Sequence, residues 1–337
     1  MTEAKADPIG YFLEDQSYHG KAERTLEAYE RVLRDFESFL ANPATGPGTA
    51  APGDAKRRDC MAWLASLRTE HAESSVATYA AYVHRFYSYM VQIGEFESNP
   101  MTLVVEEMDE TIETDPTRRE LSVEQMRSFV ADMAHPLDRA VVVTLLKTGV
   151  RVGELCNLDL DDVVLDGALE TLGYDRKPRA SIANRGQALF VPSNPGGERS
   201  AANKRKRDTI VPVDDELREV LVEWLAIRPD TTIEPAPLFV HTRTDWGARL
   251  TTQAVRATVR ERASERGWYE SGGGATENVT PHYFRHFFTT HLRDRTGDRG
   301  IVKYLRGDVA DDIIDTYTHN WGGRVRSVYE ANIYSLL

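Results

Sequence analysis

The segment from Val279 to His319 limits the possible fold most strongly, because it contains its own helix start and stop signals. Thr280 and Pro281 are residue types favoured at the N-cap and the first position of a helix. Gly297 is typical of a helix end about four turns later. A second helix is expected from Asp298 to Arg306, and apolar periodicity predicts a third helix after it.

Two side chains of the first of these helices form a candidate anion site. His282 and Arg285 are three residues apart and share one face, near the positive end of the helix dipole. In the third helix, Tyr317 follows Ile313 and Ile314 at helical spacing. Taken alone, that spacing is typical of a core tyrosine. The wider motif favours a functional one.

The motif is Pro-His-x-x-Arg-His, then Leu-x-Gly, then Tyr-Thr-His, within residues 281–319. It resembles the C-terminal box of the tyrosine recombinase (phage integrase) family. Residues 148–155 read Thr-Gly-x-Arg-x-x-Glu-Leu, which resembles the other box of that family. The resemblance implies that Arg151 is the first catalytic arginine and that Glu154 is an acidic residue supporting it.

The chemistry implied by the resemblance explains these residue types. Cutting and resealing DNA without an energy source requires a covalent link, which Tyr317 can form as a phosphotyrosine. A phenol with a pKa of about 10 must lose its proton as it attacks, and His282 is the expected base or phosphate ligand, with His286 beside it. Arg151 and Arg285 can donate bidentate hydrogen bonds to the phosphate in the transition state.

A lysine must protonate the departing 5′ oxygen. The densest basic cluster comprises Lys204, Arg205, Lys206 and Arg207. Family members carry their lysine on a β-hairpin before a strand ending in Val-Pro, and this alignment selects Lys204, with Lys206 as the alternative. Arg205 and Arg207 are expected to contact DNA phosphates from a solvated loop. The spacing from the first arginine box is longer than the family hairpin, which indicates an insertion at residues 170–200.

Asp308 departs from the family pattern, because most members have His or Trp after the glycine of the Leu-x-Gly motif. A carboxylate at contact distance should repel phosphate by about 1–4 kcal/mol. It could be protonated, turned away, paired with Arg306, or used to cap the helix leading to Tyr317. Pairing or capping is expected.

The chain is predicted to contain two domains joined by a linker. Apolar periodicity predicts helices at 22–40, 60–71 and 75–93. Residues 1–104 are therefore expected to be a helical domain, which the resemblance implies is a core-binding domain that clamps DNA. The acidic segment 105–119 is expected to be a linker and 120–337 the catalytic domain.

The catalytic domain is expected to be α+β, which gives a mainly α chain with a small antiparallel sheet. A capping box at Ser122 starts one helix, an apolar helix follows at 137–148, and strands are predicted at 168–174, 187–193 and 208–213. Two amphipathic helices follow at 214–227 and 252–267. Arg256 and Arg260 on the second could contact DNA or form a solvated face. By resemblance the C-terminal helix packs on a neighbouring protomer; docking on its own domain is the alternative.

The formal net charge of −12 argues at first against a nucleic-acid partner. However, the 41 Lys and Arg include only eight Lys, which leaves 33 Arg, and 53 residues are acidic. Such surfaces resemble those of archaeal proteins from salt-loving organisms, where an acidic average can hide a basic face.

No cofactor or metal is expected, since Cys60 and Cys156 lack metal-site spacing. The absence of a long apolar run predicts a cytoplasmic protein without a membrane span.

The predicted function is site-specific recombination of double-stranded DNA through a 3′-phosphotyrosyl intermediate. The resemblance implies a homo-oligomer, with a dimer on each site and a tetramer in synapsis, serving integration and excision or dimer resolution. A type IB topoisomerase uses the same residue types, but the short helical N-terminal domain resembles integrases better. The alternative from another class is a catalytically weak DNA-binding relative of integrases.

Overall fold

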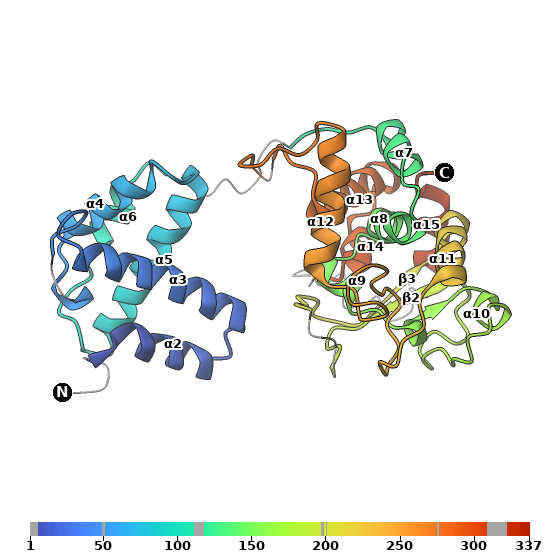
Figure 1. The fold of residues 1–337 in the computed structure, drawn as a ribbon, viewed down its shortest axis with the longest axis horizontal. Helices are drawn as coiled ribbons and strands as arrows, with labels where there is room; N and C mark the ends of the chain where they lie inside the picture. Colours follow the sequence, from blue (N-terminus) through green and yellow to red (C-terminus); the bar gives the residue numbers. More distant parts are fainter. Residues whose placement is uncertain are drawn as a thin grey trace. The chain divides into compact units, whose positions relative to one another are not determined.

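The computed structural model describes residues 6–48, 51–110, 118–196, 199, 201–274, 276–308 and 322–337. The chain divides into two compact units, Met1–Pro116 and Thr117–Leu337 (Figure 1). Both units are mainly helical, and the second also contains a small antiparallel sheet. The predicted fold class is therefore confirmed.

The first unit is a group of helices. They are α2 (Pro8–Tyr18), α3 (Glu23–Ala41), α4 (Arg57–Leu67), α5 (Glu73–Gln92) and α6 (Thr102–Glu107), with a 3-10 turn at Pro52–Asp54. Helices α3, α4 and α5 confirm the three predicted helices. Helix α2 was not predicted, although Asp7 accepts a hydrogen bond from the backbone of Gly10 and Pro8 starts the helix.

Aromatic side chains fill the core of this unit. The rings of Phe12 and Phe86 meet edge to face with centroids 5.6 Å apart, and those of Phe36 and Trp63 with centroids 5.0 Å apart.

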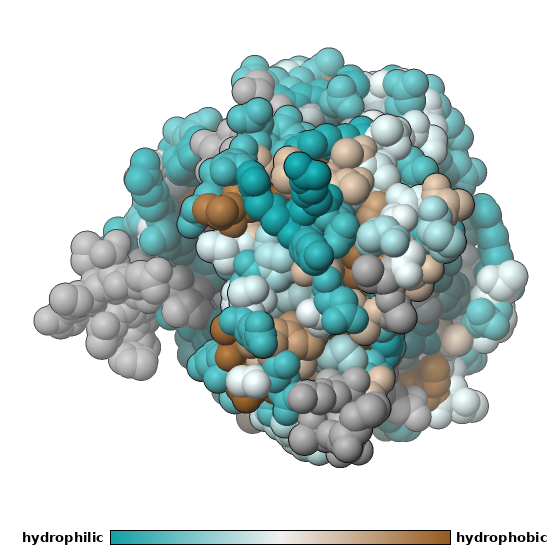
Figure 2. Space-filling view, turned by 90° about the vertical axis from the view of Figure 1, so that its left-hand side faces the viewer, coloured by the Kyte–Doolittle hydropathy of each residue, from teal (hydrophilic) through white to brown (hydrophobic). Residues whose placement is uncertain are grey.

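The face in Figure 2 is mostly hydrophilic, with hydrophobic residues in small separate patches. None of the helices in the described ranges combines the length and the apolar character needed to cross a membrane.

The end of the first unit differs from the predicted boundary. Helix α6 continues past residue 104 and packs against α4 and α5, with Val104 buried. Glu107 and Glu110 form ion pairs with Arg57 and Arg68. The first residues of the predicted linker therefore fold onto the helical unit, because their carboxylates have basic partners there.

The second unit is built around α8 (Pro136–Thr148). Residues 140–148 are all buried, and α11 and α13 pack against this helix. The predicted capping box between Ser122 and Gln125 is present. The structure also confirms the other predicted helices of this unit that lie in the described residues. They are α7 (Val123–Ala131), α9 (Val152–Cys156), α11 (Asp215–Ile227), α12 (Thr252–Glu265), α13 (Pro281–Thr296), α14 (Arg299–Arg306) and α15 (Gly322–Asn332).

The sheet has the order β1 (Val163–Val164), β2 (Ala188–Val191) and β3 (Thr209–Pro212), all antiparallel. Two of the predicted strands are confirmed as β2 and β3. The strand predicted at 168–174 is wrong, because Ala168–Thr171 form the short helix α10. Asp166 and Gly167 adopt positive φ angles of 48° and 76°, which turn the chain, and the good helix formers after them complete one helical turn.

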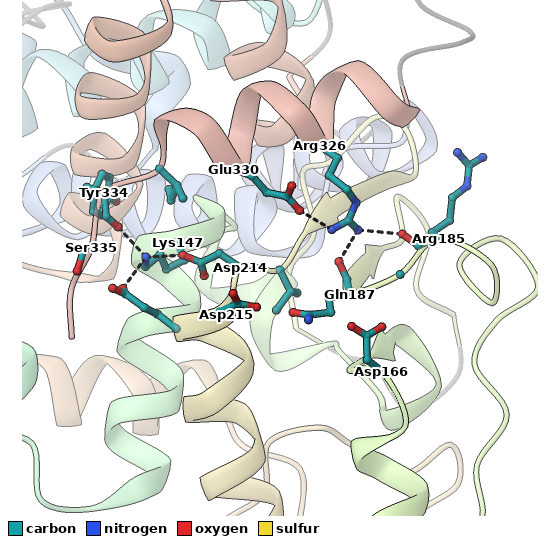
Figure 3. Close-up of a pocket in the computed structure, with 14 residues that line it drawn as sticks. Lys147, Asp166, Arg185, Gln187, Asp214, Asp215, Arg326, Glu330, Tyr334 and Ser335 are labelled. Carbon is teal, nitrogen blue, oxygen red and sulfur yellow. Dashed lines mark hydrogen bonds and ion pairs between the residues drawn. The ribbon is translucent and has the colours of Figure 1, made fainter.

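The C-terminal segment docks on its own unit, the alternative to packing on a neighbouring protomer. Lys147 is fully buried, and its Nζ lies 2.6 Å from Asp214 Oδ2, 2.7 Å from Glu216 Oε2 and 2.6 Å from the carbonyl oxygen of Tyr334 (Figure 3). The hydroxyl of Tyr329 donates to the Lys147 carbonyl at 2.9 Å. A buried ammonium with these partners fixes the chain end against α8 and α11.

Candidate active site

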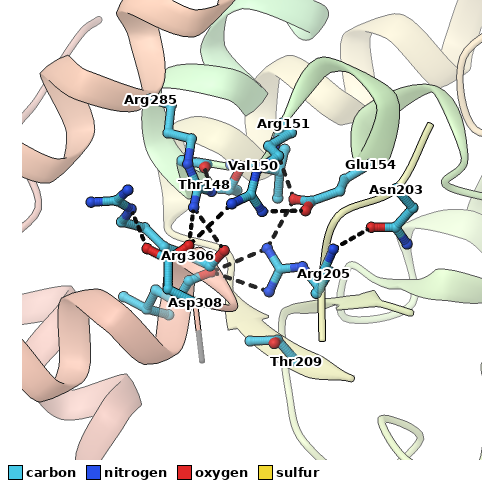
Figure 4. Close-up of polar contacts among 12 residues, drawn as sticks. Thr148, Val150, Arg151, Glu154, Asn203, Arg205, Thr209, Arg285, Arg306 and Asp308 are labelled. Carbon is cyan, nitrogen blue, oxygen red and sulfur yellow. Dashed lines mark hydrogen bonds and ion pairs between the residues drawn. The ribbon is translucent and has the colours of Figure 1, made fainter. Parts of the chain in front are cut away.

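Arg151 lies between α8 and α9, close to α13. Gly149 ends α8 with a φ of +63°, and a Cβ on it would lie 2.3 Å from the ring of Phe288 on α13. Only glycine allows both this backbone conformation and this close approach. The chain then places Arg151 at the N-cap of α9, with its guanidinium directed toward the end of α14 (Figure 4).

Arg285 reaches the same place from α13. Its side chain is 3% exposed, and it donates from Nη1 to the carbonyl of Gly149 at 2.6 Å and from Nη2 to the carbonyl of Arg306 at 3.0 Å. Burial and the neighbouring guanidiniums of Arg151 and Arg306 lower the pKa of Arg285 to about 9. It therefore stays charged at neutral pH, in surroundings that favour an anion as its partner.

The anion that these guanidiniums contact is Asp308. Its Oδ1 accepts from Arg285 Nη2 at 2.8 Å and from Arg151 Nη2 at 3.1 Å, and its Oδ2 lies 2.9 Å from Arg306 Nε (Figure 4). The side chains of Arg151, Arg306 and Asp308 are 27%, 28% and 26% exposed, so solvent reaches the cluster. The predicted pairing of Asp308 with Arg306 is confirmed. The capping alternative concerns residues outside those described.

Glu154 is a buried hydrogen-bond partner of Arg151. Its side chain has no exposed surface and accepts from the backbone N–H and Nη1 of Arg151, each at 2.9 Å. Arg205 Nη2 donates at 3.0 Å to Oε2 of the same carboxylate, the oxygen that also accepts from the Arg151 backbone N–H. Burial alone would raise the pKa of Glu154, but the guanidiniums of Arg205 and Arg151 lower it further than burial raises it. An ionised Glu154 thus fixes the orientation of Arg151.

The prediction that Arg205 contacts DNA from a solvated loop is wrong. Its side chain has no exposed surface, and it donates to Glu154 and, at 3.4 Å, to the carbonyl of Leu305. A Cβ on Gly307 would lie 2.2 Å from Arg205 Nη1, so the glycine before Asp308 makes room for this guanidinium. Its neighbours Lys204 and Lys206 are both exposed.

The remaining predicted DNA contacts differ in exposure. Arg207 is half-buried, with its guanidinium 5.6 Å from the ring centroid of Tyr304. Arg256 and Arg260 on α12 are exposed. Nearer the end of that helix, Arg262 and the C-cap residue Arg266 form ion pairs with carboxylates. The outward basic face of α12 thus consists of Arg256 and Arg260.

His282 and His286 form a pair one turn apart on α13. Their Nε2 atoms are 2.9 Å apart, so one ring donates a hydrogen bond to the other. Burial, followed by nearby arginines including Arg118 and Arg285, lowers the pKa of His282. Burial and the neighbouring His282 lower the pKa of His286 to about 4. Near neutral pH both imidazoles are therefore uncharged and able to accept a proton.

The structure thus brings Arg151 and Arg285 together, with Glu154 behind Arg151 and His282 on the helix of Arg285. Tyr317 lies outside the described residues. Arg306 is a site residue that the sequence-based site prediction omitted; its signal was its position two residues before Asp308. In the described part of the chain, no group of His, Cys, Asp or Glu side chains is arranged to hold a metal ion.

Two family models match the chain. Residues 119–322 match the phage integrase family, and residues 11–94 match the N-terminal SAM-like domain of phage integrases. The first match alone spans more than half of the 337 residues.

Two tyrosine recombinases are similar to this chain over about nine-tenths of its length. The chain is 27% identical over 317 residues to tyrosine recombinase XerC of Pelobacter propionicus, covering 91% of this chain and 88% of that protein. It is 26% identical over 324 residues to tyrosine recombinase XerD of Listeria monocytogenes, covering 92% and 93%.

Solved structures share the fold at low identity. The Tn1549 transposon integrase in complex with transposon right end DNA has a TM-score of 0.64 at 16% identity, covering 91% of this chain and 96% of that one. A lambda integrase dimer bound to a core site has a TM-score of 0.61 at 15% identity, covering 90% and 95%. With both family boxes and both domains matched, the chain belongs to the phage integrase family of tyrosine recombinases.

Proposed function

We propose that this chain is a site-specific recombinase that cuts and rejoins double-stranded DNA through a 3′-phosphotyrosyl intermediate. The observation that carries the proposal is that Arg151 and Arg285, 134 positions apart, both donate to one oxygen, Oδ1 of Asp308. A carboxylate held this way stands where one phosphate oxygen would bind.

The proposed reaction begins with attack by Tyr317 on the scissile phosphate. The tyrosine oxygen forms a bond to phosphorus, its proton passes to His282, and the bond from phosphorus to the 5′ oxygen breaks. Arg151 and Arg285 stabilise the extra negative charge on the non-bridging oxygens. The lowered pKa values of His282 and His286 support the role of a neutral base.

Lys204 is the proposed donor of the proton that the 5′ oxygen requires, with Lys206 as the alternative. Both side chains are exposed, and they flank the buried Arg205, whose partner Glu154 also contacts Arg151. Rejoining reverses these roles: the 5′ hydroxyl attacks the phosphotyrosine, and Tyr317 leaves.

The proposed DNA complex contains a dimer on each site and a tetramer in synapsis. The dimer is supported by the related lambda integrase, which is described as a dimer bound to its core site. Exposed Arg256 and Arg260 are proposed phosphate contacts. We also propose a cytoplasmic location in a salt-loving organism, with a role in integration and excision or in dimer resolution.

A nicked suicide substrate tests this function, because loss of the short 5′ fragment traps the covalent intermediate. The wild-type chain should give a protein–DNA adduct that survives denaturation, and Tyr317→Phe should give none while still binding DNA. If the wild-type chain binds the site and forms no adduct, the chain is a DNA-binding relative without strand-transfer activity.

A further inference from the structure

The segment that connects β2 to β3 and carries Lys204 is held against α9 by a buried asparagine. Asn157, at the end of α9, is 1% exposed. Its Nδ2 donates to the carbonyl of Ala201 at 2.8 Å, and its Oδ1 accepts from the N–H of the same residue at 3.2 Å. One side chain therefore satisfies both backbone groups of Ala201, as a neighbouring strand would.

The same contact requires a glycine on α9. A Cβ on Gly153 would lie 2.1 Å from the carbonyl oxygen of Ala202, far inside normal contact distance. The backbone of α9 and the backbone of the Lys204 segment thus touch directly. Gly153 and Asn157 follow Arg151 by two and six positions, so the element that positions the arginine also positions this segment.

Anchors on both sides of Lys204 complete the arrangement. The Nδ2 of Asn203 donates to the carbonyls of Pro192 and Ser193 at 2.7 and 3.1 Å, and its Oδ1 accepts from the N–H of Arg205 at 2.9 Å (Figure 4). Arg205 is in turn fixed by Glu154 at 3.0 Å. The backbone of Lys204 lies between two anchored residues, while its side chain is exposed.

Buried ion pairs also fix Arg199, which lies within the same connection. Arg199 is buried and pairs with Asp159 and, at 3.3 Å, with Asp162 Oδ2. Both aspartates belong to the stretch that follows α9. Side chains from the α9 region therefore hold the connection at Arg199 and at Ala201.

We infer that Asn157 is a positioning residue for proton transfer, holding the Lys204 segment against α9 so that the lysine ammonium reaches the departing 5′ oxygen. The inference rests on the proposed function and adds a residue that neither family box contains. Without the paired hydrogen bonds to Ala201, the segment gains conformational freedom. Lys204 then spends less time in the geometry that proton transfer needs.

The role is separable from simple stabilisation by changing the leaving group. A nicked substrate with sulfur in place of the bridging 5′ oxygen releases a thiolate, which needs no proton because the thiol pKa is about 8.5. With the oxygen substrate, Asn157→Ala should slow adduct formation by about tenfold to a hundredfold, a part of the roughly 10²–10⁴-fold effect of general acid catalysis. With the sulfur substrate, its rate should return to within about threefold of the wild-type rate, as should that of Lys204→Ala.

The controls distinguish positioning from a general loss of structure. Asn278 is also a buried asparagine that bonds to backbone, accepting from Glu270 N–H at 2.8 Å and donating to the carbonyls of Glu270 and Gly273. Any loss in Asn278→Ala should be equal on the two substrates. If Asn157→Ala does not fold, Asn203→Ala applies the same test from the other side of the segment.

Each contrary outcome has a defined meaning. Equal losses on both substrates, or no loss on either, would overturn the positioning role of Asn157. Failure of sulfur to rescue Lys204→Ala, with a wild-type adduct present, would reject both the lysine assignment and this inference while leaving the recombinase function intact. A wild-type chain without any adduct would instead reject the proposed function itself.

Discussion

Arg285 donates from Nη2 to Oδ1 of Asp308 at 2.8 Å, so the buried guanidinium expected to bind phosphate already has an internal counter-ion. Arg151 donates to the same oxygen at 3.1 Å. Asp308 therefore neutralises part of the charge that would attract DNA, and it occupies the space in which a phosphate oxygen would form the same contacts. Under the proposed function, the carboxylate and the scissile phosphate would compete for one site.

This competition predicts opposite effects of Asp308→Asn on stability and on activity. Without DNA, the variant should be less stable to urea, because it leaves guanidiniums near Arg285 without a full counter-charge. Adduct formation should rise by about tenfold, since removing even part of a repulsion of about 1–4 kcal/mol has that effect. Urea unfolding and single-turnover adduct formation measure the two quantities.

Stabilisation by inorganic phosphate provides a second test of the same competition. It should raise the unfolding midpoint of Asp308→Asn more than that of the wild-type chain, because the vacated site accepts the ion. Asp308→His introduces the residue type common in the family and should also increase adduct formation. A large decrease in adduct formation for both variants, with DNA binding unchanged, would show that the carboxylate assists the chemistry.

Arg285→Lys should lose most activity although it keeps the positive charge. Arg285 contacts Gly149 through Nη1 and both Arg306 and Asp308 through Nη2, a two-pronged arrangement that one ammonium cannot reproduce. Adduct formation should fall by about 10²–10³-fold, the usual loss for one donor to a transition-state oxyanion. Arg293→Ala, on an exposed face of the same helix, is the matched control and should leave the rate unchanged.

The sequence allowed much of this architecture to be predicted, because the signals were local. Apolar periodicity and Gly149 located α8, and Pro281 with Gly297 located α13. Helix α8 ends two residues before Arg151 at Gly149, and α13 contains Arg285, so the two helices locate both arginines of the site. The helix α10 was missed because a short apolar run fits a strand or a helical turn, and the left-handed residues before it decide the outcome.

The contacts that were not predicted depend on distant partners. Arg205 lies in a basic run typical of a solvated loop, and only the approach of Glu154 and the space beside Gly307 bury it. The anchoring of Ala201 by Asn157 joins positions 44 apart in the sequence. Periodicity describes one segment at a time, so it does not reveal which distant charge or amide a side chain meets.

The buried pair of Glu154 and Arg205 gives a stability prediction. Each side chain has no exposed surface, and their atoms approach to 3.0 Å. Removing one partner, as in Glu154→Leu, leaves an uncompensated buried charge and should lower the free energy of unfolding by about 3–5 kcal/mol. The double variant Glu154→Leu with Arg205→Met should regain most of that loss in urea unfolding, because it fills the same buried space with apolar side chains and leaves no unpaired charge.

Activity should respond differently in the double variant. Glu154 also accepts from the backbone and the guanidinium of Arg151, so the orientation of that arginine remains unsupported after stability returns. Adduct formation should therefore stay low. Full recovery of both stability and adduct formation would mean that Arg151 is positioned without the carboxylate.

The histidine pair predicts a loss of stability in acid. Burial lowers the pKa values of His282 and His286, the latter to about 4, from an ordinary value of about 6.5. The unfolded chain therefore binds protons at a higher pH than the folded chain does, so the folded state loses stability as the pH falls from about 6.5 toward 4. This contribution is fully present above pH 6.5, where both states carry neutral imidazoles.

Replacing His286 by Gln should flatten that dependence. Glutamine keeps a hydrogen-bonding side chain beside His282 but does not titrate. Urea unfolding from pH 7 to pH 4.5 should show a smaller decrease for His286→Gln than for the wild-type chain. Equal slopes for wild-type and His286→Gln would mean that His286 protonates equally easily in the folded and unfolded chains.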